Sequence, residues 1–221
     1  MITSNIIHRV FRIRCGQSSG TAFAVDVDGR QYLITARHVV DNLSDGAGIA
    51  IFSNGAWCPT AMQAVGLGSG PSDVAVLAPD RRLSPADLPV EVSSAGFTYG
   101  QECYFLGFPY DFLGNVVFTE AGYHLPFVKR ATLSCFAGDV YLLDGHNNPG
   151  FSGGPVVFGD PGRPPTKFGA VISGYKFAPE PVLVGNAVTN LTYKYNTGII
   201  VCYKIEIAMS LIHANPIGAS G

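Results

Sequence analysis

The stretch Asn148-Pro149-Gly150-Phe151-Ser152-Gly153-Gly154-Pro155 places one serine between glycines in a tight loop. Glycine adopts backbone angles that other residues avoid, and it leaves room for a second molecule to approach. Gly150 would turn the loop amides toward a bound oxygen, and Gly153 and Gly154 remove bulk beside the Ser152 hydroxyl. The loop therefore predicts a nucleophile, Ser152, with an oxyanion hole formed by Gly150 and Ser152. A plain turn is the alternative, because glycine and proline clusters usually mark turns.

Two upstream segments offer the base and the acid that a reactive serine requires. A serine hydroxyl is a weak nucleophile until a base takes its proton, and an acid commonly orients that base. His38 follows an apolar strand-like run at residues 32–35, and Asp73 precedes another at residues 74–77. Either residue alone is more often a surface, cap or turn residue. Together with Ser152 they predict a catalytic histidine, aspartate and serine.

The three segments resemble motifs of the chymotrypsin-fold (trypsin-like) serine proteases. Thr35-Ala36-Arg37-His38 is similar to the family's Thr-Ala-x-His, residues 72–77 to its aspartate before an apolar strand, and residues 151–155 to its x-Ser-Gly-Gly-Pro. Residues 143–155 are closest to the HtrA/Deg branch, and the similarity spans residues 20–212. The stretch after Ser152 is filled by the expected barrel and helix. We therefore expect no appended peptide-binding domain of the kind that HtrA-type proteases carry.

The resemblance implies a fold and an activity. The fold is all-β, with two six-stranded antiparallel β-barrels of the chymotrypsin type and a short C-terminal helix. The activity is that of a serine endopeptidase, in which His38, Asp73 and Ser152 hydrolyse a peptide bond through an acyl-enzyme intermediate. The site would lie between the barrels, with His38 and Asp73 from the first barrel and Ser152 from the second.

The family's substrate-binding positions can be placed on this sequence. His146 lies six residues before Ser152, where the family's loop lines the specificity pocket. Ile172, Ser173 and Gly174 would form the opposite wall, where relatives hold the substrate backbone as an added strand. Because no aspartate occupies position 146, a preference for arginine or lysine is not supported. A small or apolar side chain is the expected substrate preference.

Two departures from the secreted members of the family bear on activation. Phe151 stands where those enzymes have an aspartate that pairs with a newly cut N-terminus, and no Ile-Val-Gly-Gly segment occurs to provide that terminus. Val39 follows His38, where the secreted enzymes place a disulfide cysteine. We therefore expect activity without proteolytic clipping.

Strand-like runs recur at short intervals with turn signals between them, as in barrels. Residues 1–78 are the expected N-terminal barrel, 79–100 the crossing, 101–204 the C-terminal barrel and 205–214 the C-terminal helix, all within one protease domain. A hairpin is expected over Asp28-Gly29, which favours a type I′ turn. The strands expected are 6–14, 21–27, 30–35, 48–52, 57–66, 74–77, 102–107, 116–120, 127–133, 140–143, 155–158, 168–175 and 197–203.

Composition limits the partners. Of the 221 residues, 47% are apolar and 14% charged, the net charge is −2, and no basic block stands out, so nucleic acid is not an expected partner. No stretch of eighteen apolar residues and no leader pattern occur, which predicts no membrane partner and a cytoplasmic location. The five cysteines lack metal-ligand spacing and are expected to be buried free thiols, so neither a metal nor another cofactor is expected. A protein or peptide substrate is expected, and a regulatory protein partner remains open.

Two other classes of function are alternatives. The fold can be a catalytically silent peptide-binding or scaffolding module, with Phe151 holding the oxyanion loop in an inactive shape. A serine esterase or amidase of another fold is the second alternative. The order histidine, aspartate, serine argues against α/β-hydrolases, in which the serine comes first and lies in Gly-x-Ser-x-Gly.

Overall fold

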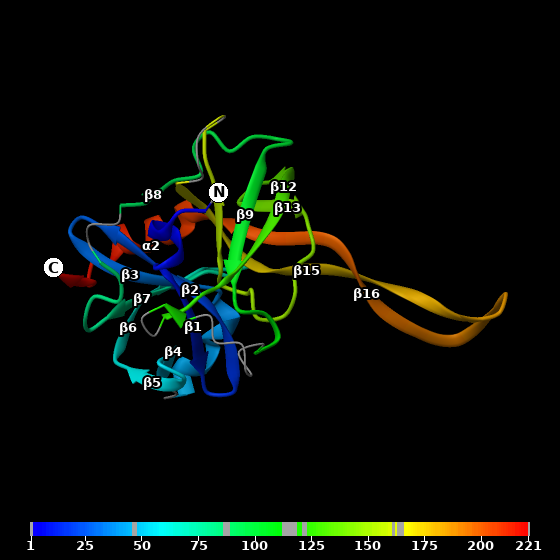
Figure 1. The fold of residues 1–221 in the computed structure, drawn as a ribbon, viewed down its shortest axis with the longest axis horizontal. Helices are drawn as coiled ribbons and strands as arrows, with labels where there is room; N and C mark the ends of the chain where they lie inside the picture. The colour runs from blue at the N-terminus through cyan, green and yellow to red at the C-terminus, as the bar shows by residue number, and fades with distance from the viewer. Residues whose placement is uncertain are drawn as a thin grey trace.

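The computed structural model describes residues 2–45, 48–85, 89–111, 119–120, 123–160, 162 and 166–220. Two curled antiparallel sheets form its body, and a long two-stranded ribbon extends from one of them (Figure 1). This architecture confirms the all-β fold class predicted from the sequence. The helical elements are α1 (Ser4–Ile7), α2 (Ile205–Ala214) and the 3₁₀ helices η1 (Arg37–Val39), η2 (Asp41–Asp45) and η3 (Pro109–Asp111).

The first sheet is a barrel that closes through a bend in the chain. Its strands follow the order β5-β4-β1-β2-β3-β7-β6. Only Ala61 separates β5 from β6, so one bent strand joins the two ends of this path and leaves six strands around the barrel. The strands are β1 (Val10–Cys15), β2 (Ser18–Val27), β3 (Arg30–Thr35), β4 (Ile49–Ser53), β5 (Ala56–Thr60), β6 (Met62–Leu67) and β7 (Ala75–Pro79), and β17 (Ala219–Ser220) pairs with β3.

The second sheet is closed by hydrogen bonds. Its path β14-β9-β12-β13-β16-β15 returns to its start because β14 also pairs with β15. The strands are β9 (Glu102–Gly107), β12 (Phe127–Ala137), β13 (Val140–Asp144), β14 (Pro155–Phe158), β15 (Lys167–Val184) and β16 (Ala187–Lys204), with the short β8 (Glu91–Val92) parallel to the start of β15. The remaining pair, β10 (Thr119–Glu120) with β11 (Tyr123–His124), forms a separate small sheet, and the His124 ring packs against Phe52 of β4.

A shared apolar core joins the barrels. Phe23 of β2 contacts Phe168 of β15 with ring centroids 4.8 Å apart. Helix α2 follows the last strand of the second barrel and buries Ile205, Ala208 and Ile212 in the same core. This face is the one that the 3, 1, 3 spacing of apolar residues predicts. Burying each of the two isoleucine side chains contributes about 1.5–3 kcal/mol, so α2 stabilises the packing of the two barrels against each other.

Several local predictions are confirmed, and the first strand begins later than predicted. Asp28 and Gly29 both have positive φ, at 49° and 75°, as a type I′ hairpin requires. The strand expected at residues 6–14 is wrong at its start, because α1 takes Ser4–Ile7 and β1 begins at Val10. A single helical turn is too short to show a 3.6-residue period. Of the strand expected at 116–120, residues 116–118 lie outside the described residues.

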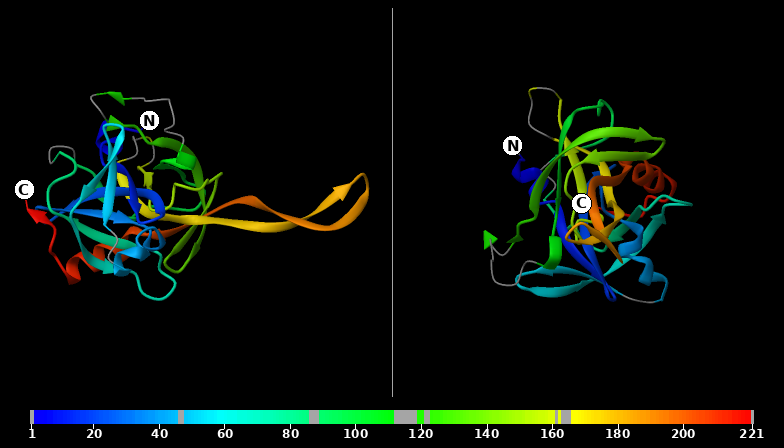
Figure 2. Two further views of the ribbon diagram at one scale, coloured as in Figure 1. Left: turned by 90° about the horizontal axis from the view of Figure 1, so that it is seen from below. Right: turned by 90° about the vertical axis from the view of Figure 1, so that its right-hand side faces the viewer.

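The largest difference lies in β15 and β16. The sequence predicts strands that end at residue 175 and resume at 197, whereas the structure continues both strands to a turn at residues 185–186. We call residues 176–196 the ribbon; it projects well beyond the barrels (Figure 2). The sequence did not predict these strands for two reasons. Pro179 and Pro181 argue against a strand, and a ribbon with both faces exposed shows no regular alternation of apolar and polar residues.

The cysteines are free, as expected, but not all are buried. Cys15, Cys103 and Cys202 are buried, whereas Cys58 and Cys135 are half-buried. Burial raises the pKa of the Cys103 thiol to about 12, so this thiol is unreactive at neutral pH. The three buried cysteines are part of the apolar cores.

Candidate active site

Strand pairing in the first barrel brings His38 to Asp73. Thr35 at the end of β3 lies opposite Ala75 at the start of β7, so the residues just beyond each strand meet at one edge of the barrel. His38 Nδ1 lies 2.7 Å from Asp73 Oδ2, and the His38 backbone N–H donates to Asp73 Oδ1 at 2.9 Å. The carboxylate thus holds both the ring and the backbone of the histidine.

This contact changes the acidity of both groups. The hydrogen bond to Asp73 raises the pKa of His38 above its ordinary value of 6.5, although burial opposes the rise. Burial alone would raise the pKa of Asp73, but hydrogen bonds from His38 and Ser173 outweigh it and leave the pKa lowered. Asp73 is therefore ionised at neutral pH, and it favours the protonated form of His38.

The serine loop is tied to both barrels. The Gly153 N–H donates to the Ile172 carbonyl at 2.7 Å, and the Ile172 N–H donates to the Gly154 carbonyl at 2.8 Å. From the first barrel, the Thr21 N–H donates to the Ser152 carbonyl at 2.8 Å. Gly153 has a φ of +83°, and a Cβ there would lie 2.1 Å from the Thr21 carbonyl oxygen. The backbone at this position thus requires glycine.

The Ser152 side chain reaches the acid through Ser173. Ser152 Oγ donates to the Ser173 carbonyl at 3.0 Å, and Ser173 Oγ donates to Asp73 Oδ2 at 2.6 Å. Among the hydrogen bonds of the described residues, none joins Ser152 to His38. The structure therefore brings Asp73 and His38 into direct contact. Ser152 is connected to them only through Ser173, whose carbonyl accepts the hydrogen bond from the Ser152 hydroxyl.

The amides of Gly150 and Ser152 have no acceptor within the described part of the chain. Gly150 has a φ of +101°, and a Cβ there would lie 2.2 Å from the Phe108 carbonyl oxygen. The Gly150 carbonyl is fixed by the Thr21 hydroxyl at 2.7 Å. Two unpaired backbone donors flanking one serine are what an oxyanion hole needs.

Lys129 of β12 holds the serine loop in a way that the sequence did not reveal. Its ammonium donates to the His146 carbonyl at 2.5 Å and to Asn148 Oδ1 at 2.6 Å, and it lies 5.5 Å from the centre of the Phe151 ring. Phe151 is fully buried and packs edge-on against Phe105, with ring centroids 5.0 Å apart. Burial lowers the pKa of Lys129 below its ordinary value. The buried Phe151 ring and the neighbouring Lys129 ammonium thus hold the loop at the position where the secreted enzymes have an aspartate that pairs with the N-terminus.

The predicted substrate-binding residues come from the loop before Ser152 and from β15. The His146 side chain is exposed, whereas the Ile172 side chain is buried and both of its backbone groups bind the serine loop. Ser173 and Gly174 are half-buried beside Ser152. The amide of Asn147, which sequence reasoning missed, donates to the Gly174 carbonyl at 3.1 Å. Asn147 therefore ties the two predicted walls together.

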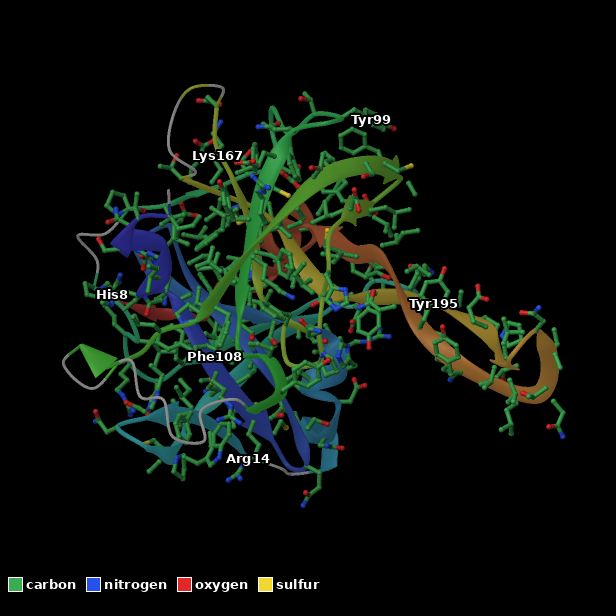
Figure 3. The ribbon with its side chains drawn as sticks, turned by 45° about the vertical axis from the view of Figure 1, so that its right-hand side comes forward. His8, Arg14, Tyr99, Phe108, Lys167 and Tyr195 are labelled. Atoms are coloured by element: carbon green, nitrogen blue, oxygen red, sulfur yellow. The ribbon has the colours of Figure 1, made fainter. Side chains whose placement is uncertain are left out.

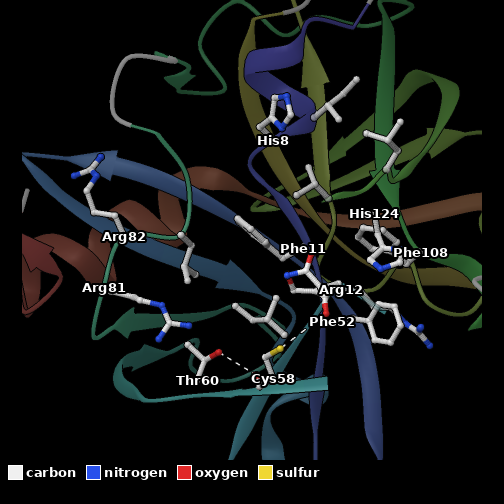
Figure 4. Close-up of a pocket in the computed structure, with 17 residues that line it drawn as sticks. His8, Phe11, Arg12, Phe52, Cys58, Thr60, Arg81, Arg82, Phe108 and His124 are labelled. Atoms are coloured by element: carbon white, nitrogen blue, oxygen red, sulfur yellow. Dashed lines mark hydrogen bonds between the residues drawn. The ribbon is translucent and has the colours of Figure 1, made fainter. Parts of the chain in front are cut away.

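A separate cavity of about 430 Å³ is lined by residues that include His8, Arg12, Arg82 and His124, and by none of His38, Asp73 and Ser152 (Figure 4). Arg12 lies over the Phe52 ring and Arg82 pairs with Asp26, so these cations are already engaged. Within the described residues, no group of histidine, cysteine and carboxylate side chains is arranged to hold a metal ion, and no helix is long and apolar enough to cross a membrane.

Two barrels with a histidine–aspartate pair on one and a glycine-flanked serine on the other define the chymotrypsin class of peptidase. The sequence model of the trypsin-like peptidase domain matches residues 20–163, well over half of the chain. The chain belongs to the trypsin-like peptidase domain family, whose members are serine-type endopeptidases. No curated protein sequence gives a significant match.

Solved structures of HtrA-type proteases share the fold. The chain is 21% identical to the HtrA-type protease AlgW with tripeptide (TM-score 0.61), covering 96% of this chain and 63% of AlgW. It is 16% identical to a serine endoprotease from Yersinia pestis (TM-score 0.61), covering 97% of this chain and 67% of that one. Rv3671c from M. tuberculosis in an inactive form is 17% identical (TM-score 0.57), with 95% and 87% covered. The chain thus spans less than two thirds of AlgW.

Proposed function

We propose that this protein hydrolyses peptide bonds through Ser152, His38 and Asp73. The observation that carries this proposal is the pair of hydrogen bonds by which Asp73 fixes His38, at 2.7 Å to the ring and 2.9 Å to the backbone. A carboxylate on Nδ1 leaves Nε2 as the nitrogen that can accept a proton, which is the tautomer that a general base needs. It also stabilises the imidazolium that forms.

In the proposed reaction, Ser152 Oγ attacks the substrate carbonyl while His38 takes its proton. The developing oxyanion accepts hydrogen bonds from the Gly150 and Ser152 amides, a contribution whose loss lowers turnover by about 10²–10³-fold. His38 then protonates the leaving amine, and an acyl-enzyme remains on Ser152. Water, deprotonated by His38, hydrolyses this ester and regenerates the serine.

The resting contacts of Ser152 define what substrate binding must accomplish. Its hydroxyl donates to the Ser173 carbonyl, so it has to rotate toward His38 before it can attack. A peptide that adds as a strand beside Ser173 and Gly174 would offer its own N–H to that carbonyl. The substrate would thereby compete for the acceptor and release the hydroxyl to His38. A protein or peptide in extended form is accordingly the proposed substrate.

A catalytically silent peptide-binding module is the second candidate. The contact between Ser152 Oγ and the Ser173 carbonyl favours it, because a serine hydroxyl kept from its base is not activated. In that case peptides would bind along the same strand edge without being cut.

A fluorophosphonate probe distinguishes the two candidates, because it forms a covalent bond only with an activated serine. We expect the wild type to be labelled and to cleave members of a peptide library. Ser152→Ala should do neither, and His38→Ala should label at least 10²-fold more slowly. Labelling of the wild type no faster than of Ser152→Ala, with peptide binding retained, would establish the silent module.

A further inference from the structure

The ribbon exposes an apolar surface that the rest of the fold does not cover. Seven apolar or aromatic side chains on it are between 38% and 69% exposed, and no charged residue occurs between Glu180 and Lys194. A two-stranded ribbon has no interior of its own and is marginally stable in water. The seven residues are Phe177, Leu183, Val184, Val188, Leu191, Tyr193 and Tyr195; Tyr195 is labelled in Figure 3, on the ribbon outside the body.

The two long edges of the ribbon differ in their capacity for further pairing. Proline has no N–H, so Pro179 and Pro181 weaken the β15 edge as a site for strand addition. The β16 edge carries no proline between Ala187 and Lys204. Strand β13 pairs with β16 from Ile199 onward, and the segment after β13 reaches Gly198 and Asn196, so the described chain offers no strand partner to this edge before Asn196. The β15 edge thus lacks two N–H donors, whereas the β16 edge keeps all of its N–H groups; we call the latter the complete edge.

The register of the ribbon identifies which backbone groups face outward on β16. Pro179 lies opposite Lys194, and Pro181 lies opposite Thr192. Prolines occupy positions where no N–H has to reach the neighbouring strand, and in an antiparallel ladder both residues of such a pair turn their polar groups outward. Thr192 and Lys194 therefore direct their N–H and C=O groups to the complete edge.

We propose that the β16 edges of two copies of this chain pair antiparallel, so that the ribbons form one four-stranded sheet in a symmetric dimer. Such pairing satisfies the outward N–H and C=O groups of Thr192 and Lys194, and it brings the apolar β16 side chains of the two copies together as cross-strand neighbours. The ribbon carries only Lys176, Glu180 and Lys194 as charges, so repulsion between the copies is weak.

The position of the prolines limits the assembly to two copies. In the paired sheet, β16 of each copy lies inside and β15 lies outside, so Pro179 and Pro181 occupy both outer edges. A third strand cannot form a complete ladder on an edge that lacks these donors. The same self-complementary edge serves both subunits, as a two-fold interface requires, and the dimer is closed. The two-fold axis reverses one ribbon, so the turn of each ribbon lies beside the base of the other.

Sedimentation velocity of the full chain at concentrations from about 1 to 100 µM tests the proposal. We expect the wild type to have twice the 23.4 kDa mass of one chain. Thr192→Pro removes an outward donor and should weaken the dimer by about tenfold or more, because symmetry removes the bond twice. Thr192→Val, the matched control, keeps the N–H and should remain dimeric.

A shortened ribbon guards against misfolding of the proline variant. Ala178 and Tyr195 lie opposite each other. Replacing residues 179–194 by Asn-Gly therefore closes the hairpin with a two-residue turn at that point. This variant should be monomeric at every concentration, with circular dichroism and unfolding temperature near those of the wild type. A wild type that sediments as one chain at 100 µM would overturn the proposal. A mass above two chains, or a shortened variant as dimeric as the wild type, would overturn it as well.

Discussion

Lys129 allows a sharp test of what holds the serine loop in place. Lys129→Met keeps the length and apolar stem of the side chain but removes the ammonium that binds the His146 carbonyl and Asn148 Oδ1. A hydrogen bond to a charged group contributes about 1.5–3 kcal/mol, and the contact with the Phe151 ring adds about 0.5 kcal/mol. Because Lys129 is half-buried, we take the lower values, which total about 3.5 kcal/mol.

If this energy keeps the Gly150 and Ser152 amides directed at the oxyanion, its loss lowers kcat by about 10²–10³-fold, since each 1.36 kcal/mol corresponds to a factor of ten. The assay is the rate of fluorophosphonate labelling, measured together with kcat and KM on a cleaved peptide. KM should change little, because the substrate strand binds beside Ser173 and Gly174. Lys129→Arg, which retains a cationic donor, should recover most of the activity.

The reasoning would be refuted if Lys129→Met labelled within twofold of the wild type. It would also be refuted if kcat stayed constant while the unfolding temperature alone fell, because Lys129 would then stabilise the fold without positioning the loop. Equal losses in the Met and Arg variants would show that the shape of lysine, and not its charge, is what the loop requires.

Three further predictions concern the neighbouring groups. Activity should fall as pH decreases through the pKa of His38, which lies above 6.5. Asp73→Asn should move the midpoint of this pH dependence down toward 6.5 and lower kcat by about 10⁴-fold. A pH–rate profile whose midpoint is the same in the variant would contradict the role of the Asp73 contact. Ser173→Ala removes one hydrogen bond to the Asp73 carboxylate and should lower kcat about tenfold in steady-state kinetics. Full activity would show that His38 alone suffices to hold the Asp73 carboxylate in place. Gly153→Ala should destabilise the protein by about 3 kcal/mol, because the new Cβ meets the Thr21 carbonyl. Calorimetry should show a melting temperature about 6–12 °C lower. A melting temperature equal to that of the wild type would disprove the strain.

Local sequence signals predicted the parts of the fold that local chemistry determines. The Asp28-Gly29 turn, strands β9 and β14 and helix α2 lie where the turn residues, apolar runs and helical spacing place them. Each of these elements is predicted from residues that are adjacent in the chain. Each also has one buried face, which produces a regular spacing of apolar residues in the sequence. The ribbon lacks a buried side and contains prolines, so its strands left no such pattern.

The candidate site divides in the same way. His38, Asp73 and Ser152 were found because each lies in a recognisable segment, and strand pairing then accounts for the contact between His38 and Asp73. Lys129 lies 22 residues before Phe151 on another strand, in a segment with no motif, and only the closed second barrel brings it to the loop. The resting acceptor of Ser152 depends on a side-chain rotation, which no sequence pattern encodes.

The position of α2 has a consequence for a chain that is still being synthesised. His38, Asp73 and Ser152 all leave the ribosome before residues 205–214, whose burial between the halves completes the shared core. A nascent chain would thus carry every reactive group while still lacking the element that fastens the halves that bear them. The two barrels would therefore be held in their final arrangement only after residues 205–214 have been made and have packed against both of them.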